Sequence, residues 1–274
     1  MNETIRPDEG NMGFKCLTGS QIKFFGVILM VFDHIHQMFH VYDVPLWFTC
    51  IGRLVAPMFL FMCAEGFHYT RSRRKYMLLL LAGFEFMNVA SLFLSRAMPN
   101  EDVTLMNNIF GTMLLCTVYM GLTDMLKSGV SEKKPGRTAL SILLMLVPIA
   151  IGAVSMAIMN MPDFLANPNA LMIMYMIQSV PNVMIVEGGP TLVATGLLFY
   201  IFREKRLIQV AVLVLAGVLT LFTFGPGEVQ WMMVFAAIPM LMYNGKRGKG
   251  SKYFFYIFYP AHIYILYTIA YLIK

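Results

Sequence analysis

Apolar segments of membrane-spanning length alternate with short polar turns along almost the whole chain. A helix needs about 20 mostly apolar residues to cross about 30 Å of hydrocarbon at 1.5 Å per residue. Such segments occupy residues 21–42, 46–68, 76–95, 107–127, 138–160, 188–202, 207–224, 229–243 and 253–273. The pattern therefore predicts an all-α fold, a polytopic integral membrane bundle of about nine or ten transmembrane helices.

A further segment, residues 169–187, is weaker because polar residues and a proline interrupt it. These are Asn169, Gln178, Pro181, Asn182 and Glu187. The segment could be a short span, a re-entrant piece or an interfacial helix. We expect the polar residues 1–20 to form a cytoplasmic N-terminal segment and residues 21–273 to form a single transmembrane domain.

The composition fits a membrane protein and excludes three soluble classes. The chain has 274 residues, of which 58% are hydrophobic and 13% charged, and its mean hydropathy is +0.66. An ordinary soluble domain carries about 45–50% apolar and about 25% charged residues. We therefore exclude a soluble globular enzyme, a disordered protein and a nucleic-acid-binding domain, and we expect the lipid bilayer to be the main partner of the surface.

Positive charges lie between the apolar segments rather than in one patch, so the net charge of +6 does not indicate a nucleic-acid partner. Most of the 21 Lys and Arg residues fall within four stretches, at 71–75, 127–137, 203–206 and 246–252. An even number of spans separates the first two stretches, and also the last two. All four stretches can therefore be cytoplasmic, together with the N-terminus.

The opposite ends of the predicted helices carry acidic residues, as the outward face of a membrane protein should. These residues are Asp43, Glu101, Asp102, Asp163, Glu187 and Glu228. Between the second and third basic stretches, the same rule allows only an even number of crossings. We therefore expect that residues 169–187 do not cross the membrane fully.

The first predicted helix is rich in ionisable residues, which are costly inside a bilayer and usually functional there. Lys23 and His34 are separated by ten residues, so about 1,100° of helix rotation places them on one face, about 16 Å apart. Val27 and Met30 complete that face. This face could form a path that has a cation at its cytoplasmic end and a base at its other end, deep in the membrane. The alternative is that Lys23 snorkels to the headgroups and His34 bonds a neighbouring helix.

Asp33 stands next to His34, and a carboxylate near an imidazole is a usual way to orient a base. Asp33, His36 and His40 also have spacings that could hold a divalent metal. No further His or Cys cluster supports such a site, and we expect none. On the last helix, His262 has a depth similar to that of His34. The two histidines could meet if the bundle closes on itself, or His262 could serve only in helix packing.

Arg53 and Glu65 lie near opposite ends of the second predicted span, about 18 Å apart, so they cannot pair with each other. Glu85 on the third span is a candidate partner for either residue, in a structural ion pair or in catalysis. A cationic cluster follows the second span and contains Arg71, Arg73, Arg74 and Lys75. It is either an ordinary positive-inside signal or a site for the phosphates of a nucleotide-like donor.

Three blocks of sequence carry a resemblance to a known family. They are Gln21 to His34, Ile51 to Phe59 running on to Arg71, and Lys252 to His262. Looser matches are Asn108 to Thr112 and Glu187 to Gly189 followed by Phe199-Tyr200. Along almost its whole length the chain resembles the TraX family, whose founding member acetylates the N-terminus of a conjugative pilin.

The TraX family is distantly similar to membrane acyltransferases of the acyltransferase-three type, which carry an Arg, ten residues and then a His on the first helix. This chain has Lys23 and His34 at that spacing, and the Lys lacks the bidentate fork of an Arg. The resemblance implies that residues 21–273 form an acyltransferase-like domain in the plasma (inner) membrane of a prokaryote.

The resemblance also implies a reaction, the movement of an acetyl group from cytoplasmic acetyl-CoA to a protein amine or a glycan hydroxyl. His34 would be the general base, oriented by Asp33, with His262 close to it. Arg53 or Asn108 would stabilise the oxyanion. The phosphates of the acyl-CoA would be held by Lys23, Arg71, Arg73, Arg74 and Lys75.

A rival hypothesis is a proton-coupled secondary transporter, because deep Asp, Glu, His and Arg residues also make proton relays. Such transporters carry Gly- or Pro-broken helices in corresponding halves of the chain, and Pro57 and Pro260 are not clearly related in that way. A membrane scaffold without activity is a third hypothesis. It gives no reason for Lys23 and His34 to share one helix face.

Overall fold

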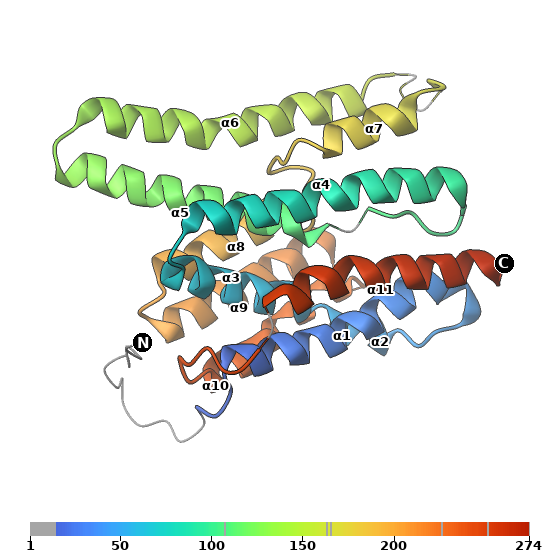
Figure 1. The fold of residues 1–274 in the computed structure, drawn as a ribbon, viewed down its shortest axis with the longest axis horizontal. Coiled ribbons are helices and arrows are strands. Elements are labelled where there is room, and N and C mark those ends of the chain that lie inside the picture. The colour runs from blue at the N-terminus through green and yellow to red at the C-terminus, as the bar shows by residue number, and fades with distance from the viewer. Residues whose placement is uncertain are drawn as a thin grey trace. The chain divides into compact units, whose positions relative to one another are not determined.

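The computed structural model describes residues 15–273 apart from residues 107, 163, 165, 226 and 251. Residues 1–14 of the predicted N-terminal segment, and the predicted outward-facing Asp163, lie outside this described part. The helices are α1 (Gly19–Phe39), η1 (His40–Tyr42), α2 (Trp47–Gly52), α3 (Val55–Tyr69), α4 (Arg73–Ala97), α5 (Ile109–Ser131), α6 (Pro135–Met159), α7 (Ala170–Gln178), α8 (Gly189–Ile201), α9 (Arg206–Phe224), η2 (Val229–Ala236), α10 (Ala237–Met242) and α11 (Lys252–Leu272), drawn in Figure 1. The predicted all-α class is confirmed.

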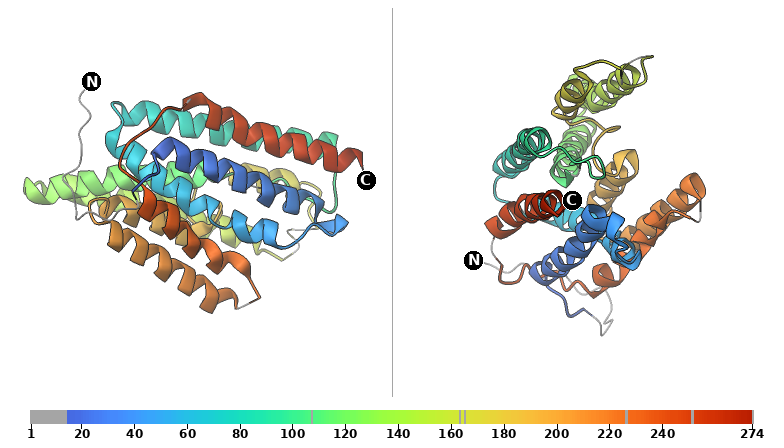
Figure 2. Two further views of the ribbon diagram at one scale, coloured as in Figure 1. Left: turned by 90° about the horizontal axis from the view of Figure 1, so that it is seen from below. Right: turned by 90° about the vertical axis from the view of Figure 1, so that its right-hand side faces the viewer.

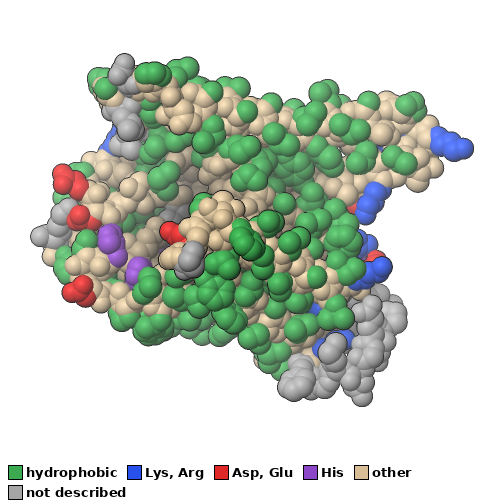
Figure 3. All heavy atoms as spheres, turned by 180° about the vertical axis from the view of Figure 1, so that it is seen from behind, with side chains coloured by type: hydrophobic (Ala, Val, Ile, Leu, Met, Phe, Trp, Pro, Cys, Tyr) green, Lys and Arg blue, Asp and Glu red, His purple; other side chains and the backbone are tan. Residues whose placement is uncertain are grey.

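Seven helical segments among the described residues are long and apolar enough to cross a membrane. They are Gly19–Tyr42, Trp47–Tyr69, Arg73–Ala97, Ile109–Ser131, Pro135–Met159, Arg206–Phe224 and Tyr253–Leu272. Two shorter apolar helices, Gly189–Ile201 and Val229–Met242, fall where the sequence predicts two more spans. Hydrophobic side chains are spread over the face drawn in Figure 3, and the Lys and Arg side chains lie at its edge. The chain is therefore a multi-pass membrane protein.

The weak segment 169–187 is helical only over the nine residues of α7. Nine residues rise about 13.5 Å, which is less than half of the hydrocarbon thickness. Asn182 helps to hold the following turn, because its Oδ1 accepts from the backbone N–H groups of Met184 and Ile185. This short helix agrees with the expectation that the segment does not cross the membrane fully.

The second predicted span is divided into α2 and α3 at Arg53 and Leu54. Pro57 is the third residue of α3, where its missing N–H cannot donate to the carbonyl of Arg53. A proline is tolerated in the first turn of a helix, because N–H groups there have no partner within the helix. The division places Arg53 at a junction between two helices.

The described chain divides into two compact units. Unit 1 contains residues 15–62 and 202–273, which comprise α1, α2, the first half of α3, α9, η2, α10 and α11. Unit 2 contains residues 63–201, which comprise the rest of α3 and α4 to α8. The predicted single domain spans both units.

In unit 1, α1 and α11 lie side by side and run in the same direction (Figure 2). At one end, the backbone N–H of Gly19 donates to the carbonyl of Lys246, six residues before α11. At the other end, the hydroxyl of Tyr42 donates to the carbonyl of Ile273. Because the two helices are parallel and aligned at both ends, residues in the middle of each helix meet at the same depth.

Unit 2 is built around α5, which packs against α4, α6 and α8. Its core contains Leu115, Tyr119, Val183, Val186 and Val193. The α5–α6 hairpin closes tightly at Gly129, where an added Cβ would lie 2.8 Å from Thr138 Oγ1. The absence of a side chain at Gly129 therefore allows the two helices to approach each other at their turn.

Gly217 has the corresponding role between α9 and η2 in unit 1. An added Cβ would lie 2.3 Å from Val234 Cγ1 and 3.1 Å from the carbonyl oxygen of Trp231. Gly217→Ala is therefore expected to destabilise the protein by about 1–3 kcal/mol and to lower the Tm of the purified protein in a thermal melt. The control is Gly227→Ala, because an added Cβ there meets open space. Equal Tm values for the two variants would contradict this packing.

Candidate functional site

His34 on α1 and His262 on α11 form a buried pair in unit 1. His34 Nδ1 lies 2.7 Å from His262 Nε2, and the two residues are 4% and 7% exposed. Of the two possibilities that the sequence left open for His262, the structure therefore has the contact with His34, and the parallel packing of α1 and α11 explains it. The His262 ring also stacks on Phe258, one turn earlier, with ring centroids 5.0 Å apart and an interplanar angle of 15°.

The hydrogen bonds of His262 decide which nitrogen of His34 carries a lone pair. His262 Nδ1 lies 2.8 Å from the carbonyl oxygen of Phe258. A carbonyl can only accept, so Nδ1 of a neutral His262 carries the proton and its Nε2 is an acceptor. His34 Nδ1 must therefore donate to His262 Nε2. In a neutral His34 ring, the lone pair is then on Nε2, the nitrogen that can act as a base.

Within unit 1 Arg53 forms an ion pair with Asp33, a partner that the sequence did not indicate. Arg53 Nη2 donates to Asp33 Oδ1 at 2.8 Å and to Thr49 Oγ1 at 2.7 Å. The Thr49 hydroxyl donates to the same oxygen of Asp33 at 2.7 Å. Arg53 Nη1 donates to Gln230 Oε1 at 3.2 Å. No pattern in the sequence pointed to Thr49 or Gln230 as members of this network.

These bonds change the role that the sequence suggested for Asp33. The carboxylate was expected to orient His34, but it accepts from Thr49 and Arg53, and His34 Nδ1 bonds to His262. Adjacent residues on a helix point about 100° apart, so the side chains at positions 33 and 34 face different neighbours. His262 therefore occupies the orienting position that was expected for Asp33.

Gly52 at the end of α2 allows this network to form. An added Cβ at Gly52 would lie 2.3 Å from both Cβ and Cγ of Asp33. No side chain fits there unless α1 and α2 separate, so the glycine sets how closely Asp33 approaches Thr49 and Arg53. The sequence shows the Ile51-Gly52-Arg53 order but not this approach.

The predicted face of α1 that carries Lys23 and His34 is continuous. The helix runs unbroken from Gly19 to Phe39, and Val27 and Met30 between the two ionisable residues are 7% and 5% exposed. Lys23 is half-buried, and its Nζ lies 5.7 Å from the centroid of the Phe255 ring on α11. Lys23 and His34 therefore lie on one apolar, largely buried face.

The cationic cluster lies in unit 2 and is not uniform. Arg71, Arg74 and Lys75 are exposed, whereas Arg73 donates to Asp124 Oδ2 at 2.7 Å and to the Tyr200 hydroxyl at 3.0 Å. The Tyr200 hydroxyl donates to the same Asp124 oxygen at 2.7 Å. Arg73 is thus the member of the cluster held in a local ion pair, and the sequence did not single out Asp124.

Glu65 and Glu85, the remaining acidic candidates, also lie in unit 2. Glu65 is 5% exposed, and Glu85 on α4 is half-buried. No group of three or more His, Cys, Asp or Glu residues that could hold a metal ion is found in the part of the chain that the structure describes.

The two predicted oxyanion stabilisers differ in the donors that they offer. Asn108 in unit 2 gives both hydrogens of Nδ2 to the carbonyl of Phe84 and to Asn88 Oδ1, each at 3.0 Å. Its Oδ1 is buried without a partner among the described residues, and it can only accept. Arg53 uses its Nε, one hydrogen of Nη1 and both hydrogens of Nη2. An oxyanion needs donors, so one N–H of Arg53 is the group that fits.

Three comparisons with known proteins bear on this site. The sequence model of the family described as TraX protein matches residues 18–270, nearly the whole chain. That range contains His34, His262, Asp33 and Arg53. No curated protein and no solved structure matches the chain.

Proposed function

Because the chain belongs to the TraX family, we propose that it is a membrane-embedded acyltransferase that moves an acetyl group from cytoplasmic acetyl-CoA to an amine or hydroxyl acceptor. The observation that carries the proposal is the hydrogen-bonded chain from the Phe258 carbonyl through His262 to His34. It fixes one tautomer of His34 and leaves Nε2 as the basic nitrogen. Acyl transfer to an amine or hydroxyl needs such a base to take the proton of the nucleophile.

The proposed reaction uses His34 Nε2 as the base. His34 Nε2 takes a proton from the acceptor as its nitrogen or oxygen attacks the thioester carbon, and the carbonyl oxygen becomes an oxyanion. The C–S bond then breaks, the C=O bond reforms, and the CoA thiolate takes the proton from the imidazolium. The acetylated acceptor and CoA thiol leave, and His34 is neutral again.

His262 acts in this scheme as a positioning residue. Its Nε2 accepts from His34 Nδ1, so it holds the ring of His34 and stabilises the imidazolium that forms during transfer. The stacking of His262 on Phe258 fixes the ring plane of His262 in turn. His34 itself is only 4% exposed, so side chains or helices must move for the two substrates to reach it.

The phosphates of CoA need cationic donors. In unit 1 the candidate donor is Lys23, near the start of α1. In unit 2 the candidate donors are the exposed residues Arg71, Arg74 and Lys75. Arg73 already neutralises Asp124. We therefore assign Arg73 mainly to holding the start of α4, although the sequence grouped it with the phosphate ligands.

This division of the cluster predicts different results for two arginine variants. Arg74→Ala is expected to weaken CoA binding roughly tenfold with an unchanged Tm, because it removes an exposed phosphate donor. Arg73→Ala is expected to lower the Tm, because it leaves Asp124 and Tyr200 without their cation. Calorimetric titration with CoA and thermal melts measure the two effects. A fall in Tm with Arg74→Ala, or in CoA affinity alone with Arg73→Ala, would contradict the assignment.

The proposal itself is tested by thermal melts of the purified protein with CoA, with acetyl-CoA and with a panel of small solutes. A ligand that binds only the folded state raises the Tm, and the rise grows with the logarithm of the ligand concentration above its Kd. We expect acetyl-CoA and CoA to raise the Tm and the small solutes to leave it unchanged. A rise with a solute and none with CoA would favour the proton-coupled transporter over the enzyme.

A further inference from the structure

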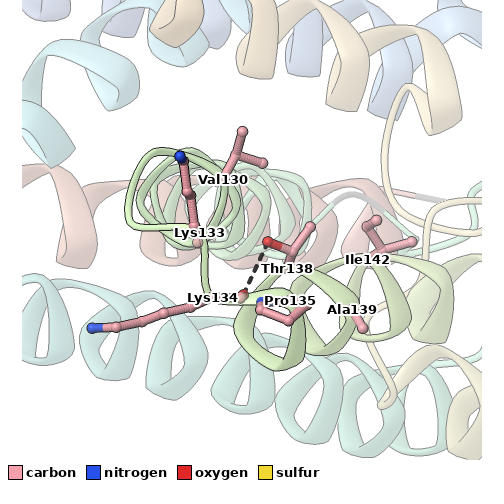
Figure 4. Close-up of a pocket in the computed structure, with 8 residues that line it drawn as sticks. Val130, Lys133, Lys134, Pro135, Thr138, Ala139 and Ile142 are labelled. Carbon is pink, nitrogen blue, oxygen red and sulfur yellow. Dashed lines mark hydrogen bonds between the residues drawn. The ribbon is translucent and has the colours of Figure 1, made fainter.

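An open pocket of about 380 Å³ lies at the turn between α5 and α6 in unit 2. Val130 from the end of α5 and Thr138, Ala139 and Ile142 from the first turns of α6 line it, with Lys133 and Lys134 on the turn between them (Figure 4). The pocket therefore has an apolar wall and a cationic rim, the combination that an amphiphile with a negative headgroup requires.

The charges on the turn leave one lysine without an acidic partner. Glu132 is paired with both Lys134 and Arg137. Lys133 lines the same pocket, and no hydrogen bond or ion pair within the described chain engages its ammonium group. Lys133, Lys134 and Arg137 against the one carboxylate of Glu132 give the turn an excess of positive charge beside the pocket.

The backbone of Lys133 is in the left-handed region, with φ of 52°. The last turn of α5 ends as Lys133 N–H donates to the Val130 carbonyl and Lys134 N–H donates to the Gly129 carbonyl, a helix end at which glycine is the favoured residue. A lysine at this position has a backbone cost that a glycine does not have. Its presence points to a use for the side chain.

The position of the pocket decides between a soluble anion and a lipid. Both α5 and α6 are long and apolar enough to cross a membrane, so their shared turn lies at the level of the headgroups in either orientation. Beyond the residues that line the pocket, α6 has further exposed apolar side chains, including Leu140, Leu143 and Leu144. Acyl chains can pack along these residues while a phosphate stays at the lysines.

From these observations we propose that the α5–α6 turn binds the phosphate of an anionic phospholipid, with Lys133 as its main donor and the apolar face of α6 against its acyl chains. This site does not depend on the proposed acyltransferase activity. Its chemistry is shared by free phosphate, but the apolar wall and the membrane depth favour the lipid.

The test is a thermal-melt and native-mass-spectrometry titration of the detergent-purified full chain with phosphatidylglycerol, phosphatidylcholine or inorganic phosphate. Phosphatidylglycerol is expected to raise the Tm increasingly with its concentration and to remain bound in the mass spectrum, with little effect from the other two. Lys133→Gly is expected to weaken that binding roughly fivefold without a fall in the starting Tm, because glycine suits the left-handed position. Lys249→Gly, an exposed lysine on the α10–α11 turn, is the control of equal charge.

Three results would overturn the proposal. Equal effects of phosphatidylcholine and phosphatidylglycerol would show that the charge of the lipid is not recognised. Equal losses with Lys133→Gly and Lys249→Gly would show general surface attraction. A Tm rise with inorganic phosphate that is lost in Lys133→Gly would assign the pocket to a soluble anion. Filling the pocket with Ala139→Phe provides a second variant, and it is expected to reduce phosphatidylglycerol binding with no change of charge.

Discussion

Replacing His34 by Ala is expected to lower the rate of acetyl transfer by about 10² to 10⁴-fold, the range that a positioned general base contributes. The acceptor would then have no group that takes its proton as it attacks the thioester. The measurement is the rate of CoA thiol release from acetyl-CoA in the presence of an amine-bearing peptide. His262→Ala is expected to have a smaller effect, about 10- to 100-fold, because it removes the orienting bond and leaves the base.

The matched control for this prediction is His40→Ala. His40 follows α1, is exposed, and lies 3.2 Å from the carbonyl oxygen of Gln37 in its own turn. Its removal should leave the rate of thiol release within a factor of two or so. A normal rate in His34→Ala, or equal losses in His34→Ala and His40→Ala, would remove His34 from the mechanism. Tm values of the three variants separate loss of catalysis from loss of fold.

The second large effect is expected from the Asp33–Arg53 pair. The two side chains are 19% and 31% exposed, and a bilayer is a poor solvent for an unpaired charge. Asp33→Ala or Arg53→Gln alone should each lower stability by about 1–3 kcal/mol, less than for a fully buried pair because both groups keep some exposure. The double variant should lose less than the sum, and the difference is the coupling energy of the pair.

Lys134 and Glu132 form a matched ion pair for comparison. Their side chains are 55% and 44% exposed, and such surface pairs contribute about 0–1 kcal/mol. Chemical unfolding of the single and double variants of each pair would measure both coupling energies. The account predicts a clearly larger coupling for Asp33 and Arg53. Equal coupling energies would mean that the network around Arg53 does not stabilise unit 1.

The architecture was predictable because the bilayer imposes it. Hydrophobic length fixes where helices begin and end, and all nine predicted segments end within four residues of an observed helix or of two helices in series. The segment at 229–243 is the one that begins as a 3-10 helix. The shared face of Lys23 and His34 was also predictable, because it depends only on the 3.6-residue repeat within one helix.

Partners on different helices were harder to predict, because they depend on which helices pack together. The depths of His34 and His262 were readable from their distances to the polar turns, and α1 and α11 prove to be neighbours. The pair of Arg53 with Asp33 was not predicted, since it depends on the break before α3 and on the small Gly52. The sequence contains no periodic signal for such a contact.

The Arg73–Asp124–Tyr200 cluster illustrates the same limit in unit 2. In the sequence Arg73 is one of four neighbouring cationic residues. Only the packing of α4, α5 and α8 shows that Arg73, unlike the other three, is held in an ion pair with Asp124. The tautomer of His34 is also invisible in the sequence, because it depends on the carbonyl that His262 contacts.

The most direct test of the central claim uses the purified protein in sealed liposomes, with acetyl-labelled acetyl-CoA outside and acceptors enclosed. The acceptors are a peptide with a free N-terminal amine and a disaccharide with free hydroxyls. We expect label to appear on an enclosed acceptor with the wild-type chain and not with His34→Ala. Accumulation of intact labelled acetyl-CoA inside the liposomes, with both acceptors unlabelled, would contradict it.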